Sequence, residues 1–122
     1  KKSSEANFLL KESMEALRSF RDGSTWSSNG LGNVNTSDSN PYHLAQDTSL
    51  NPPTWALVTG AETVDIFTRK IVFDLVSRDP SSGNIETAYN SAHDDTNTKK
   101  VTVMVNWENK TTNLSAYFTN WK

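Results

Sequence analysis

The sequence predicts an α+β fold in which a long N-terminal helix packs on an antiparallel β-sheet. Apolar side chains recur at steps of three and four through residues 1–22, which is typical of one face of an α-helix. Residues 54–122 instead contain runs in which apolar and polar residues alternate, as in half-buried strands. Because the helix stripe and the sheet face both need covering, the simplest arrangement stacks one on the other in two layers.

The composition indicates one polar domain without special covalent support. A chain of 122 residues fits a single domain, 1–122, and the absence of cysteine excludes a disulfide scaffold and a cysteine-based zinc site. Hydrophobic residues make up only 34% of the chain, and the polar excess is Asn, Ser and Thr, which favour turns and strand surfaces. The net charge of −2 and the scattered Lys and Arg residues give no basic stripe, so we expect no nucleic-acid partner.

The predicted helix, 1–22, contains no interior Gly or Pro, and Gly23 follows where a left-handed residue commonly ends a helix. Glu5 lies early in it and Arg18 lies late, which suits the helix dipole. Its apolar stripe is the candidate contact face of the helix. The stripe consists of Ala6, Leu10, Met14, Leu17 and Phe20.

Residues 23–53 are predicted to form a variable loop region, because Gly, Asn, Ser and Pro punctuate them. We expect one short strand within this region, at 41–45. Three aromatic residues in or beside it have two open interpretations, as anchors to the core or as a ligand-binding surface such as a sugar platform. These residues are Trp26, Tyr42 and Trp55.

Residues 54–122 are predicted to form the antiparallel sheet. Arg69 interrupts an otherwise apolar strand face, so we expect it to pair with carboxylates or to cover apolar surface. Residues 85–89 fit a short strand or an extended loop, and Trp121 is expected to pack back on the body. The predicted strands are 55–58, 64–78, and a hairpin of 99–108 with 112–118.

No motif for catalysis or for a cofactor is visible. The sequence has no nucleophile elbow, zincin motif or phosphate loop, and we therefore predict no enzyme, no cofactor and no metal. His43 and His93 lie in polar segments. The turn 94–97 holds a dense acidic cluster, Asp94 and Asp95, but calcium needs six to eight oxygen ligands. An Asx turn is therefore the favoured interpretation, with calcium as the alternative.

Several short segments share their residues and their order with one bacterial family. Residues 15–22 read Glu-Ala-Leu-Arg-Ser-Phe-Arg-Asp and are followed by a loop that contains Trp. The further matching segments are 42–44, 66–69, 78–79, 83–85, 95–103, 105–107 and 115–121. Together they resemble type IV pilin-like proteins, in particular minor pilins and pseudopilins, and the resemblance implies a pilin-like fold.

The resemblance implies a structural subunit of a type IV pilus-like filament or secretion pseudopilus, which assembles with other pilin subunits through its N-terminal helix. It also implies a hydrophobic half-helix ahead of Lys1 that anchors the subunit in the inner or cytoplasmic membrane before assembly. The expected location is the cell surface or an extracellular filament. The chain departs from the family pattern because it has no C-terminal cysteine pair, and it includes no prepilin cleavage site.

Two other functions stay open. The chain could be a minor or tip pilin that binds a ligand or a surface through Trp26, Tyr42 and Trp55. A free secreted α+β binding domain is the less favoured alternative.

Overall fold

The computed structural model describes residues 2–23, 26, 30–36, 40–47 and 54–120. Within them the chain forms one α-helix, six strands and two short 3₁₀ turns. The helix is α1 (Lys2–Gly23), and the 3₁₀ turns are η1 (Leu31–Asn33) and η2 (Ser91–His93). The strands are β1 (Tyr42–Asp47), β2 (Thr54–Thr59), β3 (Glu62–Val64), β4 (Phe67–Ser77), β5 (Asp94–Trp107) and β6 (Lys110–Thr119).

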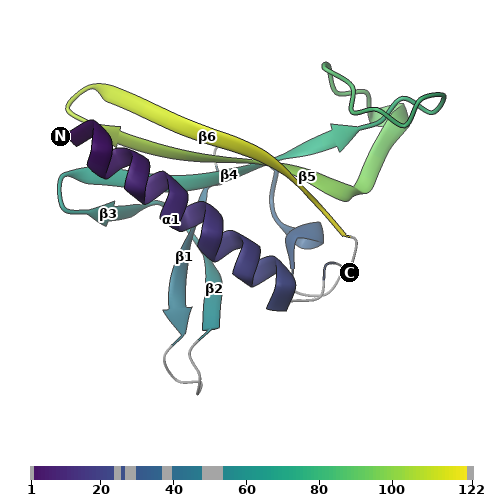
Figure 1. Ribbon diagram of the computed structural model, residues 1–122. Helices are drawn as coiled ribbons and strands as arrows, with labels where there is room; N and C mark the ends of the chain where they lie inside the picture. The colour runs from purple at the N-terminus through teal and green to yellow at the C-terminus, as the bar shows by residue number, and fades with distance from the viewer. Residues whose placement is uncertain (1, 24–25, 27–29, 37–39, 48–53, 121–122) are drawn as a thin grey trace.

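The strands form a single antiparallel sheet of order β2-β1-β4-β5-β6, with β3 paired to β4 beside this path. The long pairs β4–β5 and β5–β6 make its centre (Figure 1). β1 meets β4 only at the Tyr42–Ile71 pair, so the β1–β2 hairpin diverges from the rest of the sheet. α1 lies across one face of the central strands (Figure 1).

The predicted fold class, a long N-terminal helix packed on a sheet in a pilin-like α+β fold, is wrong. Strands take up about half of the residues that the structure describes, and the single helix among them has 22 residues, so the six-stranded sheet dominates this part of the chain. The prediction underestimated the length of the strands where the sequence is polar. The short strand expected at 41–45 is β1, which runs on to Asp47, and β5 begins at Asp94, where a turn was predicted.

The core lies between α1 and the sheet. The apolar stripe of the helix faces the inward side chains of β4, β5 and β6, and both sets are buried. Each fully buried aliphatic or aromatic side chain contributes about 1.5–3 kcal/mol relative to an exposed one. The largest fully buried apolar side chains of this core are Phe73, Phe118, Leu17, Leu31, Ile71, Val101, Val103 and Val105.

The predicted β5–β6 hairpin is confirmed, and its turn is tighter than expected. Trp107 pairs with Lys110, so only Glu108 and Asn109 lie between the strands. Both have positive φ, 46° and 68°, which is the type I′ pattern that matches the twist of antiparallel strands. β6 therefore begins two residues before the predicted start at 112.

Arg69 pairs with carboxylates on the core side of the sheet, which confirms that interpretation. Its side chain is only 10% exposed. Its Nε donates to Glu62 at 2.6 Å, and its Nη1 donates to Glu12 at 2.7 Å and to the carbonyl oxygen of Leu9 at 3.0 Å. One guanidinium thus joins α1, β3 and β4.

Residues 78–93 leave the sheet between β4 and β5. Ile85 makes a single bridge with Arg78, and the residues after it contain no strand, so the extended-loop alternative for 85–89 holds. The carboxylate of Asp79 accepts the amide N–H of Ser81 at 2.7 Å and shapes the turn. Trp121 lies outside the described residues.

Candidate functional site

The predicted assembly stripe of α1 lies inside the molecule. Ala6, Leu10, Met14 and Leu17 are buried against the sheet, and Phe20 is half-buried at the edge of the same core. This stripe covers the chain's own sheet, so it is not a surface for another subunit. Among the described residues, no helix combines the length and hydropathy that a membrane span needs.

The three aromatic residues of the predicted ligand surface are packed. Trp26 is buried, and its Nε1–H donates to the carbonyl oxygen of Thr96 at 2.9 Å. The ring of Tyr42 meets Phe73 edge-on with centroids 5.5 Å apart, while Trp55 lies half-buried against the core. The structure therefore favours the anchor interpretation for all three over a ligand platform.

Gly32 shows how closely the chain packs on Trp26. A Cβ atom at Gly32 would lie 2.5 Å from both Cδ1 and the carbonyl oxygen of Trp26. The amide N–H of Gly32 also donates to that carbonyl at 2.9 Å. Only glycine fits at this position, because a side chain would overlap Trp26. The close contact holds η1 against the indole ring.

The carboxylate of Asp95 accepts hydrogen bonds from three protein donors. Its Oδ2 accepts Nε of Arg78 at 2.6 Å and Oγ1 of Thr98 at 2.7 Å, and its Oδ1 accepts the amide of Asn97 at 3.0 Å. Burial alone would raise the pKa of Asp95, but the hydrogen bonds from Thr98, Arg78 and Asn97 and the guanidinium charge outweigh it and lower the pKa. The bond from Asn97 is the Asx contact that the sequence favoured.

The remaining candidate metal ligands have partners of their own. Asp94 accepts the hydroxyl of Tyr89 at 2.9 Å. His43 Nδ1 lies 2.9 Å from the carbonyl oxygen of Gly60, and His93 Nδ1 lies 3.1 Å from Oε2 of Glu86. Across the described part of the chain, no three His, Asp or Glu side chains gather in a group that could hold a metal ion.

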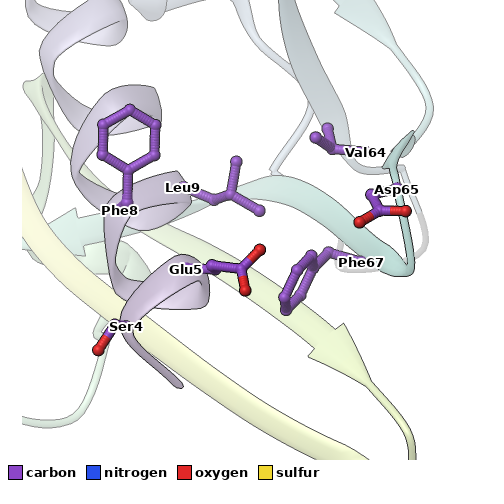
Figure 2. Close-up of a pocket in the computed structure, with 7 residues that line it drawn as sticks. All are labelled: Ser4, Glu5, Phe8, Leu9, Val64, Asp65 and Phe67. Atoms are coloured by element: carbon purple, nitrogen blue, oxygen red, sulfur yellow. The ribbon is translucent and has the colours of Figure 1, made fainter. Parts of the chain in front are cut away.

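An apolar groove opens beside the first turns of α1, against the turn that joins β3 to β4 (Figure 2). Its volume is about 310 Å³. It is lined by Ser4, Glu5, Phe8, Leu9, Val64, Asp65 and Phe67. Sequence reasoning missed this site, and the one available signal was Phe8, an aromatic residue outside the apolar stripe of the helix.

The groove has a buried floor and an exposed aromatic rim. Leu9 and Phe67 are buried, whereas Phe8 is 64% exposed and projects outward from the helix (Figure 2). Glu5 reaches in from the helix and Asp65 from the β3–β4 turn (Figure 2). The lining thus combines apolar surface with two carboxylates. Such a surface suits contact with another macromolecule better than bond-making chemistry.

A second, polar pocket of about 190 Å³ lies between the segment 85–89 and strands β4 to β6. Tyr89 and Tyr117 are exposed there. Desolvation, followed by the hydrogen bond to Asp94 and its negative charge, raises the pKa of the Tyr89 hydroxyl. The pocket is lined by Asp74, Leu75, Val76, Ser77, Ile85, Glu86, Thr87, Tyr89, Lys100 and Tyr117.

Comparison with known proteins assigns no function to either of these two sites. No family model, no curated protein and no solved structure matches the chain.

Proposed function

We propose that this chain is a structural subunit of a type IV pilus-like filament or secretion pseudopilus, and that it assembles through its N-terminal helix without catalysis. The observation that supports the proposal is the apolar groove at the first turns of α1, with Phe8 exposed at its rim. In the proposal, a hydrophobic segment ahead of Lys1 holds the subunit in the cytoplasmic membrane before assembly. The assembled subunit then lies in a filament at the cell surface.

The proposed contact uses the outward side of the helix, because the buried stripe is occupied by the sheet. Covering Phe8 removes most of an aromatic side chain from water, which contributes about 1–2 kcal/mol for each contact. A filament repeats this contact at every subunit. Glu5 and Asp65 at the groove predict that the neighbouring pilin subunit supplies cationic groups together with apolar side chains.

The test is incorporation of a full-length gene product into filaments sheared from its native host. Phe8→Asp places a charge at the groove, and we expect it to reduce the amount of subunit in filaments by about tenfold or more. Ser19→Asp is the matched control, because it adds the same charge at another exposed position of α1. Normal incorporation of Phe8→Asp, or filaments that lack the chain, would contradict the proposal.

The alternative function, a minor or tip pilin that binds a ligand, has support from the polar pocket. Two exposed tyrosine rings, Tyr89 and Tyr117, stand beside Glu86 and Lys100, a combination that suits a small polyhydroxylated ligand. NMR titration with monosaccharides tests it. We expect shifts at the pocket that Tyr117→Ala abolishes and Thr111→Ala leaves intact, and an absence of shifts would contradict a saccharide site.

A further inference from the structure

Strand β6 forms an open edge of the sheet. It is last in the strand order, and among the described strands it pairs only with β5 (Figure 1). It is ten residues long, and its pairing with β5 runs without a register shift from the turn to Thr119. A long, regular strand edge is a template for a further strand, because half of its backbone groups have no partner within the sheet.

The hairpin turn determines which backbone groups point outward. In a two-residue type I′ turn, the two residues that flank the turn, Trp107 and Lys110, exchange backbone N–H···O=C hydrogen bonds. Every second residue of β6 after Lys110 therefore also directs its N–H and C=O groups toward β5. The residues between these direct N–H and C=O away from β5. They are Thr111, Asn113, Ser115, Tyr117 and Thr119.

Within the described residues of β6, three features that usually block strand addition are missing: proline, a row of charged side chains and a β-bulge. Residues 111–119 contain no proline and no charged side chain, and Lys110 at the turn is the only charge in the strand. Leu114 and Tyr117 are also exposed, at 39% and 49%, one on each side of the sheet. The edge therefore offers apolar contact as well as hydrogen bonds.

We propose that β6 pairs antiparallel with β6 of a second copy of this chain, about a two-fold axis at Ser115. This axis places Thr111 opposite Thr119, Asn113 opposite Tyr117, and Ser115 opposite its own copy. All of these residues are neutral and have outward backbone groups, so every opposed pair forms ladder hydrogen bonds and none sets like charges together. Lys110 lies opposite neutral Asn120.

A second copy fits this edge better than an unrelated strand because the edge is complementary to itself. The pairing would join two sheets into one continuous sheet, with both helices on the same side. It does not rest on the proposed function, because it uses neither the groove nor a segment ahead of Lys1.

Sedimentation equilibrium of the chain tests the proposal by mass. We expect twice the 13.6 kDa of one chain at high concentration. Ser115→Lys sets two like charges opposite each other and should raise the dissociation constant about tenfold or more. The matched control is Thr102→Lys, on the same face one strand inward. Each substitution adds one charge and removes the Thr102–Ser115 hydroxyl contact of 3.1 Å.

Amide hydrogen exchange of the wild-type chain tests the same pairing without a variant. The amides of Thr111, Asn113, Ser115, Tyr117 and Thr119 should become protected only as concentration rises, whereas the alternate amides of β6 are protected throughout. A chain that stays monomeric, equal weakening by both lysine variants, or a dimer whose outward amides exchange freely would overturn the proposal. The last outcome would place the contact elsewhere on the chain.

Discussion

At the scale of single residues, Arg69 joins three separate elements, α1, β3 and β4. It stands on the apolar side of β4, yet it is satisfied by two carboxylates and a helix carbonyl. Alternation in the sequence identified Arg69 as an exception, for which we expected either carboxylate partners or a role in covering apolar surface. Glu12 lies 57 residues away in the chain, and local pattern carries no information about a partner at that distance.

Replacing Arg69 by Met should lower the free energy of unfolding by about 2–3 kcal/mol, because Glu12 and Glu62 lose their shared cation and the Leu9 carbonyl loses a donor. Both carboxylates keep some contact with water, which limits the decrease in the free energy of unfolding. Urea unfolding measures the change. Lys70→Met, on the opposite face of the same strand, is the control and should stay within about 0.5 kcal/mol. Equal effects would show that the ion pairs are not the cause.

Asp95 makes stability depend on pH. Its pKa in the folded state is lowered, chiefly by hydrogen bonds from Thr98 and Arg78 that outweigh burial. The resulting stabilisation is complete above the ordinary pKa of about 3.9 and is lost as pH falls through the lower folded value. We expect the stability gap between wild type and Asp95→Asn to shrink between about pH 5 and pH 2. A gap that stays constant over this range in urea titrations would contradict the assignment.

At the scale of elements, the sequence predicted helices and strands correctly where the hydrophobic period and the turn residues at the ends indicate the same structure. The helix over 1–22 and the β5–β6 hairpin were both predicted, and the structure has α1 over Lys2–Gly23 and the two strands around a short turn. The β1–β2 hairpin was missed as a unit. Its strands pair fully, from Tyr42–Thr59 to Asp47–Thr54, although Gln46 and Asp47 give β1 no apolar alternation. Backbone pairing therefore overrides local propensity there.

The β5–β6 turn can be improved. Glu108 and Asn109 both have positive φ, whereas Asn followed by Gly is the preferred pair for a type I′ turn. The double substitution Glu108→Asn with Asn109→Gly should raise the free energy of unfolding by about 1 kcal/mol. Thermal unfolding followed by circular dichroism measures this. An unchanged or lowered melting temperature would mean that Glu108 makes contacts that offset its backbone strain.

At the scale of the whole molecule, the structure buries a surface that the sequence predicted for contacts and exposes a groove that the sequence did not predict. The apolar stripe of α1 is part of the core, and the proposed filament contact lies instead at the groove where residues 4–9 meet residues 64–67. Helix periodicity cannot indicate which apolar residues a distant turn will leave uncovered. Phe8 projects outward from the helix at the rim of the groove, and the opposite wall comes from the β3–β4 turn, whose position depends on the pairing of β3 with β4.

In the proposed function, the groove at the first turns of α1 is a contact between filament subunits. The chain contains no cysteine, so single cysteines report the accessibility of chosen positions cleanly. Phe8→Cys tests the groove and Ser19→Cys tests an exposed control position on the same helix. Maleimide should label both in the purified chain, and in assembled filaments only Phe8→Cys should become protected, by about tenfold or more. Equal labelling of Phe8→Cys in the two states would contradict the account.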